Sequence, residues 1–187
     1  MTILYLVRHG EVHNPTGIIY GRLPNFGLSD NGRAQLQQAA ELLAPHAPFH
    51  GLYASPMQRA QESAAILGAH LNLEIATQEQ IIETGIGAYQ GKRFEDLPKP
   101  YITEEPVHEG IECAASIRKR ILTWVDEICQ LHPDGKVIAV SHRDPIIVTL
   151  LHWIKKGLED LPDFDLPPGG VHEIILGKTD TQVRFLQ

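Results

Sequence analysis

Apolar residues along this chain follow two alternating kinds of pattern, one typical of strands and one of helices. Residues 3–7 and 136–140 are almost wholly apolar and rich in β-branched side chains, as in strands that are buried on both faces. Further strands are expected at residues 52–54, 71–75, 171–176 and 182–186. The last two would form a closing hairpin.

Between the strands, apolar residues recur every three to four positions, which predicts amphipathic helices. The expected helices lie at residues 29–43, 55–70, 111–131 and 145–153. Ser29 offers a side-chain oxygen for the first helix N-terminus. For the second helix, Ser55 would be the N-cap and Pro56 the first helical residue.

Strands that alternate with helices predict a layered fold with crossover connections. We therefore expect the α/β class, as a three-layer sandwich with a mostly parallel central sheet and helices on both faces. Two segments look irregular: the loop at 9–28, and an excursion at 92–109 that is rich in proline and charge, with a short helix near Phe94. Loops this long in a compact domain are usually functional.

Composition limits the classes of partner. The 187 residues suit a single domain, 1–187, with 43% hydrophobic and 21% charged residues. A net charge of −7 argues against broad binding to nucleic acid or to an anionic membrane. Any anion-binding site must therefore be a local cationic pocket in an acidic protein.

The two cysteines, Cys113 and Cys129, favour a reducing compartment. Both fall in the helix expected at 111–131, too far apart along its axis to pair with each other. We expect free thiols and a cytoplasmic location. The N-terminus shows no secretion signal, and the sequence has no apolar run that could span a bilayer. It leaves the oligomeric state open, a homodimer included.

Chemically useful side chains follow the strongest elements. Both buried strands end in a histidine, His9 and His142. Arg8 precedes the first, and Arg59 lies in the first turn of the helix expected at 55–70, where backbone N–H groups already favour an anion. Glu83 precedes a glycine-rich turn. Because ligands bind at the carboxyl ends of strands in α/β sheets, we expect these groups to share one site.

Four motifs together resemble the histidine phosphatase superfamily, also called the phosphoglycerate mutase-like family. They are Arg8-His9-Gly10, Ser55-Pro56-Met57-Gln58-Arg59-Ala60, Glu83 with the following Gly87, Tyr89, Gly91 and Lys92, and Ser141-His142. The likeness runs from residue 3 to about residue 150. It implies a phosphoglycerate mutase-like fold and, in the phosphatase branch, an enzyme that takes no metal and no cofactor.

The chemistry expected of these residues is phosphoryl transfer. A neutral imidazole at His9 is not repelled by a phosphate ester, so it can take up the phosphoryl group and release it to water. Arg8, Arg59 and His142 would hold the phosphoryl oxygens. Glu83 would protonate the leaving alkoxide and then deprotonate the attacking water, which requires a raised pKa.

Outer contacts to phosphate or substrate are expected from the loops. Asn14 lies one position before the place where many family members carry an asparagine, and Tyr20, Gly21 and Arg22 follow in the same loop. Arg143 replaces the glycine that usually follows the second histidine. Its side chain either adds a third cation to the pocket or turns outward and pairs with Asp144.

We therefore predict a metal-independent phosphomonoesterase that hydrolyses a small phosphorylated metabolite. Two alternatives stay open: a mutase that moves phosphoryl groups within or between phosphoglycerates, and a non-catalytic member that binds a phosphorylated ligand or a protein partner. Thr84-Gly85-Ile86-Gly87 follows Glu83, whereas the family mutases follow the acid with Arg-His-Tyr-Gly and insert a longer clamp. This difference favours hydrolysis.

Overall fold

The computed structural model describes residues 1–177 and 180–186 and is built on one six-stranded sheet in the order β3-β2-β4-β1-β5-β6. The strands are β1 Thr2–Arg8, β2 Gly51–Ala54, β3 Ile75–Thr77, β4 Lys136–Ser141, β5 Val171–Leu176 and β6 Thr181–Leu186. The first four pair in parallel, while β5 pairs antiparallel with β1 and β6 antiparallel with β5. This confirms the mostly parallel sheet and the closing hairpin.

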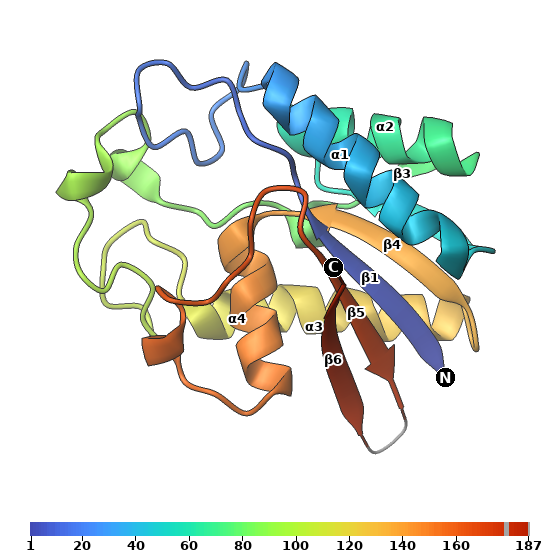
Figure 1. Ribbon diagram of the computed structural model, residues 1–187. Coiled ribbons are helices and arrows are strands. Elements are labelled where there is room, and N and C mark those ends of the chain that lie inside the picture. The colour runs from blue at the N-terminus through green and yellow to red at the C-terminus, as the bar shows by residue number, and fades with distance from the viewer. Residues whose placement is uncertain (178–179, 187) are drawn as a thin grey trace.

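Helices cover both faces of the sheet (Figure 1). They are α1 Asp30–Leu43, α2 Gln58–Leu71, α3 Ala114–Leu131 and α4 Arg143–Trp153. Helices α1 and α2 pack on one face and α3 and α4 on the other, and each pair shares a separate hydrophobic cluster with the sheet. The three-layer α/β sandwich is therefore confirmed. Within the described residues, no helix combines the length and apolarity needed to cross a membrane.

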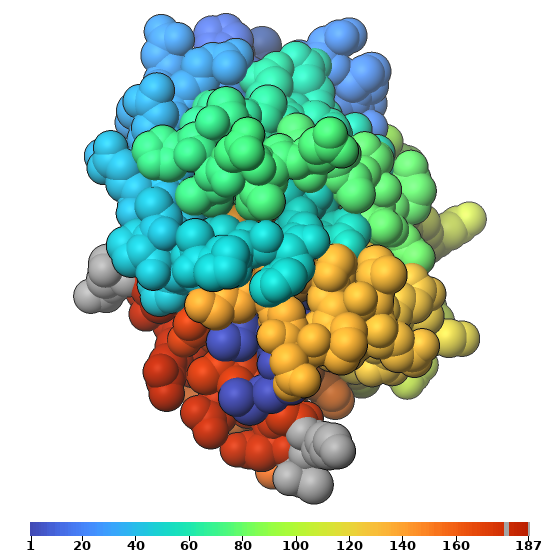
Figure 2. Space-filling view, turned by 90° about the vertical axis from the view of Figure 1, so that its right-hand side faces the viewer, coloured from blue at the N-terminus to red at the C-terminus, as the bar shows by residue number. Residues whose placement is uncertain are grey.

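Strand β1 lies inside the sheet and contributes to both clusters. Its side chains alternate between the faces, so Leu4 and Leu6 pack with α3 and α4, while Tyr5 and Val7 pack with α1 and α2. Figure 2 shows the blue start of the chain between the orange segment that leads into β4 and the red hairpin. A strand buried on both faces has no polar side to show, which explains its continuous apolar run.

Pairing register brings the two histidine motifs together. Arg8 at the end of β1 lies opposite Ser141 at the end of β4, and the N–H of His9 donates to the Ser141 carbonyl. Both strands therefore end at the same edge of the sheet. Their next residues, His9 and His142, leave the sheet side by side.

The loop after His9 is held tightly against the start of α1. Ser29 caps this helix as predicted, since its Oγ accepts from the N–H of Gly32. A side chain on Gly10 would collide with the carbonyl of Gly32, and one on Gly32 with the backbone of Glu11. Only two glycines permit this approach, which sets the direction of the chain directly after His9.

Two predicted boundaries are wrong. Helix α2 begins at Gln58 rather than at Pro56, because Met57 is still extended with φ −68° and ψ 138°. The strand expected at 71–75 forms at Ile75–Thr77 instead. Leu71 completes α2, and Asn72 closes it in the left-handed conformation, so the chain becomes extended only afterwards.

Smaller differences concern two other helix starts and the excursion. Helix α3 begins at Ala114 and α4 at Arg143. The short helix near Phe94 is a single 3₁₀ turn, Phe94–Asp96. Here the excursion folds back on the first long loop, where the Ile19 N–H donates to the Lys92 carbonyl at 2.8 Å. The two irregular segments thus meet above the carboxyl edge of β1.

Candidate active site

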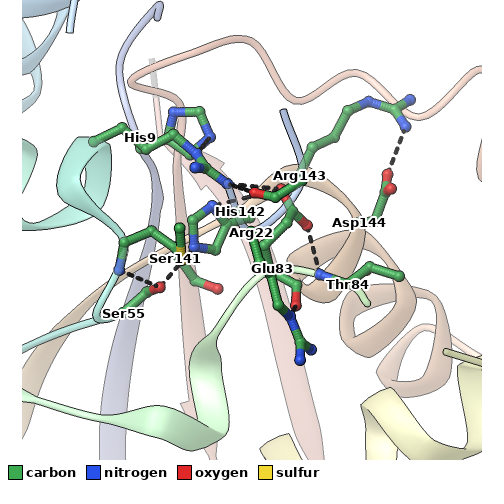
Figure 3. Close-up of polar contacts among 12 residues, drawn as sticks. His9, Arg22, Ser55, Glu83, Thr84, Ser141, His142, Arg143 and Asp144 are labelled. Atoms are coloured by element: carbon green, nitrogen blue, oxygen red, sulfur yellow. Dashed lines mark hydrogen bonds and ion pairs between the residues drawn. The ribbon is translucent and has the colours of Figure 1, made fainter. Parts of the chain in front are cut away.

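His9 and His142 form the centre of the candidate site at the carboxyl ends of β1 and β4 (Figure 3). Their ring centroids are 5.1 Å apart, with the ring planes inclined at 61°. Both residues are almost completely buried, with exposed fractions of 3% and 0%. Two buried imidazoles at one sheet edge are thus ready to act on the same group.

The hydrogen bonds of His9 define its tautomer. Its Nδ1 lies 2.7 Å from the carbonyl oxygen of Gly10, which can only accept, so Nδ1 carries the proton. Its Nε2 accepts from Arg59 Nε–H at 3.2 Å. The lone pair of Nε2 therefore faces the guanidinium group of Arg59.

Arg59 is the central cation of the site. It lies in the first turn of α2 and is fully buried. Its Nη2 donates to the carbonyl of Gly21 at 2.8 Å and lies 3.5 Å from Glu83 Oε2. The ring of Tyr20 packs over its guanidinium carbon at 4.7 Å. These contacts fix the position of the guanidinium group and offset the free-energy cost of burying its charge.

Glu83 and His142 face each other across the site. Glu83 Oε2 lies 3.5 Å from His142 Nδ1, and Glu83 Oε1 accepts from the N–H of Thr84 at 2.8 Å. On its other side, His142 Nε2 lies 2.7 Å from the hydroxyl of Ser55. This serine holds the ring so that Nδ1 points toward Glu83 (Figure 3).

A cavity of about 290 Å³ opens above these groups. Its lining residues come from both long loops and from the ends of β1 and β4: Arg8, His9, Ile19, Tyr20, Gly21, Glu83, Thr84, Ile86, Phe94, Leu97, Tyr101, Arg143 and Asp144. Arg8 reaches it while donating from Nη1 to the carbonyl of Leu166 at 2.6 Å. The polar end of this cavity is formed by Arg8, His9 and Glu83. Arg59 and His142 are fully buried beside these residues and are not part of the lining.

Several buried polar atoms in and beside the cavity lining lack a partner. Among residues 1–177 and 180–186, they include Arg8 Nε, Arg59 Nη1, Thr84 Oγ1 and His142 Nδ1. Buried donors are almost always paired in native proteins. Such atoms in one region, two of them on guanidinium groups, indicate a site for an anion with several oxygens.

The pKa values of the two histidines fit this cationic environment. Burial and the nearby Arg59 charge hold the pKa of His9 well below its ordinary value, with a smaller contribution from Arg8. Burial and Arg59 lower the pKa of His142 in the same direction. Both rings are therefore neutral at pH 7, and Nε2 of His9 keeps its lone pair.

The pKa of Glu83 shifts in the opposite direction, above its ordinary value. Burial raises its pKa to about 7, and the carboxylate of Asp144 adds to the rise against the opposing charge of Arg59. From the sequence, burial and an incoming phosphate were expected to raise this pKa. In the structure, the Asp144 carboxylate also raises it before any phosphate is bound. Glu83 can therefore exchange a proton near neutral pH.

The same side chains raise the question of a cation. His9, Glu83 and His142 each offer a ligand atom, and these atoms lie within 4.8 Å of one another. However, the Arg59 side chain contacts two of the three, at His9 Nε2 and Glu83 Oε2. A fixed positive charge at this place repels a metal ion and attracts an anion, so the residues fit phosphate better than metal.

A comparison with protein families agrees with this reading of the site. The family model of the histidine phosphatase superfamily, branch 1, matches residues 4–187. The chain belongs to the histidine phosphatase superfamily. The likeness noted from the motifs up to about residue 150 thus extends through the closing hairpin.

Curated relatives of this chain include both phosphatases and a mutase. An uncharacterised protein of Mycobacterium tuberculosis is 37% identical over 84% of this chain and 81% of its own length. Phosphoserine phosphatase 1 of Hydrogenobacter thermophilus is 32% identical, covering 78% and 73%. A 2,3-bisphosphoglycerate-dependent phosphoglycerate mutase of Thermoplasma acidophilum is 29% identical, covering 86% and 80%.

A solved structure supports the fold. A mutant phosphoserine phosphatase from Entamoeba histolytica in complex with phosphoserine superposes with a TM-score of 0.85 at 24% identity, covering 100% of this chain and 98% of that one. At this identity the match establishes the phosphoglycerate mutase-like fold alone.

Of the outer site residues predicted from the sequence, three line the cavity. They are Tyr20, Gly21 and Arg143. Arg143 also donates from Nη1 to Asp144 Oδ1 at 3.2 Å, so it lines the cavity and pairs with Asp144 at the same time.

Asn14 and Arg22 are not among the residues that line the cavity. Asn14 uses its amide within its own loop, where Nδ2 donates to the Ile18 carbonyl and Oδ1 accepts from the Ile18 N–H. Arg22 lies behind Glu83 and donates from Nε to its carbonyl at 2.7 Å. Their sequence positions gave no sign of these partners.

Three functional contacts escaped the sequence argument. Ser55 was predicted to cap α2, but the late start of that helix leaves its hydroxyl beside His142. Asp144 reaches the cavity and raises the pKa of Glu83. Glu112 lies outside the motifs and holds the segment that carries Glu83. Of these three residues, only Ser55 lies within one of the sequence motifs, as part of its Ser-Pro pair.

Glu112 braces the segment that carries Glu83 at three points. Its carboxylate accepts from Arg22 and from the N–H of Gly85, and forms a two-point contact with Arg120. Arg120 in turn donates to the carbonyl of Gln80 at 2.6 Å. The chain is thus held on both sides of Glu83.

Loss of the Glu112 carboxylate should leave the position of the Glu83 side chain less fixed. In Glu112→Ala, we expect the hydrolysis of alkyl phosphates, which need a proton donor, to fall about tenfold, with a smaller loss on 4-nitrophenyl phosphate. Initial rates on the two esters measure the difference. Glu127→Ala, at an exposed position of α3, is the matched control. Equal losses on both esters would mean that Glu112 does not position Glu83.

Proposed function

We propose that this protein is a metal-independent phosphomonoesterase that hydrolyses a small phosphorylated metabolite through a phosphohistidine on His9. The observation that carries the proposal is the cluster of nitrogens around His9. His9 Nε2 lies 3.2 Å from Arg59 Nε, and Arg8, Arg59 and His142 each have a buried nitrogen without a partner. A nucleophile and its oxyanion partners thus converge on one point.

In the first step, the lone pair of His9 Nε2 attacks phosphorus and the P–O bond to the leaving group breaks. Charge on the transferring group is stabilised by the Arg8 and Arg59 guanidinium groups. The leaving alkoxide takes its proton from Glu83, whose pKa of about 7 keeps much of it protonated at neutral pH.

In the second step, the carboxylate of Glu83 accepts a proton from water as the water oxygen attacks phosphorus. The P–N bond breaks, phosphate leaves, and His9 regains its lone pair. We assign the proton of His142 to Nδ1, so that it donates to a phosphoryl oxygen. Ser55 supports this tautomer, because its hydroxyl can donate to Nε2 while accepting from the N–H of Met57.

A mutase is the second candidate, because one curated relative carries that name. A mutase must hold a phosphoglycerate carboxylate and keep the phosphoryl group from water. The segment that follows Glu83 lacks the Arg-His-Tyr-Gly of family mutases. We infer that water is the acceptor. We also infer that the protein is a single domain, with a homodimer left open, that has no nucleic acid or membrane partner. Its free thiols support a cytoplasmic location.

The proposal is tested by incubation with 4-nitrophenyl phosphate and with 3-phosphoglycerate, each in the presence of a metal chelator. We expect chelator-resistant release of inorganic phosphate. Isomerised phosphoglycerate would favour the mutase, and neither product from a broad panel of phosphate esters would favour a non-catalytic binding protein.

Arg59 should affect substrate binding and chemistry together. In Arg59→Ala, we expect KM to rise and kcat to fall about 10²-fold, because the guanidinium contacts both ground and transition states. Steady-state kinetics on 4-nitrophenyl phosphate measure both constants.

Because Arg59 is fully buried, thermal unfolding must show that the variant folds, and Arg59→Lys provides a milder change. Arg33→Ala, at an exposed arginine of α1, serves as the control. Unchanged constants in a folded Arg59 variant would remove this residue from the phosphate site.

A further inference from the structure

The outer part of the active-site cavity differs from its floor. Above the histidines and arginines, the walls are mostly apolar or aromatic: Ile19, Tyr20, Ile86, Phe94, Leu97 and Tyr101. Ile19 and Ile86 are each only 5% exposed, whereas Phe94 is 58% exposed at the rim. A leaving group attached to a phosphoryl group on His9 would lie against these side chains.

The charged side chains of the outer cavity are already paired with each other. Arg143 Nη1 donates to Asp144 Oδ1 at 3.2 Å, and Tyr101 donates its hydroxyl proton to Asp144 Oδ2 at 2.6 Å. Arg143 Nη2 donates to the carbonyls of Leu161 and Pro162 at 3.0 and 3.1 Å. The pair has no net charge, and both carboxylate oxygens have partners.

No other cation or carboxylate remains for the leaving group. Among the described residues that line the cavity, the cations are Arg8 and Arg143, and the carboxylates are Glu83 and Asp144. Arg8 and Glu83 belong to the phosphoryl chemistry proposed above. Arg22 is held by Glu83 and Glu112. A carboxylate or ammonium on the substrate would therefore lose water without gaining a free partner.

We propose that the substrate is a phosphate monoester of an uncharged, apolar alcohol. This inference rests on the proposed function and names the substrate class of the same site. It distinguishes the chain from relatives named for phosphoserine or phosphoglycerate, whose leaving groups carry charge. Burial of apolar surface against Ile86, Leu97 and Phe94 provides the affinity.

A second hollow extends this apolar surface. Its volume is about 430 Å³, and it shares Phe94, Leu97 and Tyr101 with the wall of the first cavity. Its other side comprises Pro98, Lys99, Pro100, Ile102, Leu158, Leu161 and Pro162. An alkyl chain that passes the shared wall would meet further apolar side chains, so longer chains should be accepted.

The test compares aliphatic esters with similar reacting groups: hexyl phosphate, glycerol 1-phosphate, phosphoserine and 3-phosphoglycerate, with 4-nitrophenyl phosphate as a general reporter of activity. We expect kcat/KM for hexyl phosphate to exceed that for each of the other three aliphatic esters at least about tenfold. Release of inorganic phosphate measures every ester in the same way.

Two variants of Leu97 test whether the apolar wall of the cavity causes the preference for hexyl phosphate. Leu97→Asn should lower the ratio of hexyl to glycerol phosphate hydrolysis about fivefold, because it places an amide against the alkyl chain. Leu97→Met, which nearly conserves volume and polarity, should retain the ratio. Val107→Asn is the matched control, since Val107 belongs to the same excursion, is 68% exposed and lies outside this cavity.

The outcomes separate the two proposals. If phosphoserine or 3-phosphoglycerate is hydrolysed as well as hexyl phosphate, the apolar class is overturned and the phosphatase function stands. The proposed substrate class is also overturned if Leu97→Asn and Val107→Asn change the ratio of hexyl to glycerol phosphate hydrolysis equally. If no ester is hydrolysed, 4-nitrophenyl phosphate included, the phosphatase function itself fails and the substrate class with it.

Discussion

Replacement of His9 by alanine should abolish turnover, with kcat falling about 10⁴-fold or more on every phosphate ester. The reason is that, among the described residues that line the cavity, His9 is the one that carries an imidazole. His142 Nδ1 points toward Glu83, and its Nε2 is occupied by Ser55. Loss of His9 therefore removes the covalent route entirely, although Arg8 and Arg59 can still hold phosphate.

The covalent intermediate offers a direct measurement. Wild-type protein that is mixed with a ³²P-labelled ester and quenched in alkali should carry label that is lost in acid, as expected for a phosphorus–nitrogen bond. His9→Ala should carry none, and His70→Ala, at an exposed histidine of α2, should behave as wild type. Acid-stable label, or full activity in His9→Ala, would contradict the mechanism.

Replacement of Glu83 by glutamine should affect esters according to their leaving groups. We expect kcat to fall about 10² to 10³-fold on hexyl phosphate, whose alkoxide needs a proton, and much less on 4-nitrophenyl phosphate, whose phenolate leaves without one. Parallel kinetics on the two esters measure this difference. Equal losses on both would show that Glu83 is not the proton donor.

The pH dependence provides a second measure of Glu83. Burial and Asp144 raise its pKa to about 7, so the acid form that protonates the leaving group is lost as pH rises through this value. The ratio of kcat/KM for hexyl phosphate to that for 4-nitrophenyl phosphate should therefore fall above about pH 7. Asp144→Asn removes a negative charge that raises this pKa, so the fall should move to lower pH. A ratio that does not change with pH would contradict the assignment.

Much of the fold could be predicted from local patterns. The run at 3–7 has no polar face, so it had to be a strand covered on both sides, and it lies inside the sheet. The apolar stripe of α1 and the cap at Ser29 are also local features. Such features depend on neighbours three or four residues away, which are visible in the sequence.

Predictions failed where a distant partner decides the conformation. Ser55 and Pro56 have the composition of a helix start, yet the helix begins at Gln58 and the Ser55 hydroxyl lies beside His142, 87 residues away. This outcome does not follow from local propensity, because the hydrogen bond between Ser55 and His142 exists only in the folded chain.

By itself, the sequence determined the family of this protein and pointed to five side chains that the structure brings together, because strand patterns and short motifs place polar groups at the carboxyl ends of strands. Only the tertiary structure decided how these groups are arranged and which neighbours they have. It brings Asp144 near Glu83 and Glu112 behind it, and it pairs Arg143 with Asp144 so that the outer cavity is left without free charge. These effects depend on distances between residues far apart in the chain, and a pKa or a specificity changes with each of those distances.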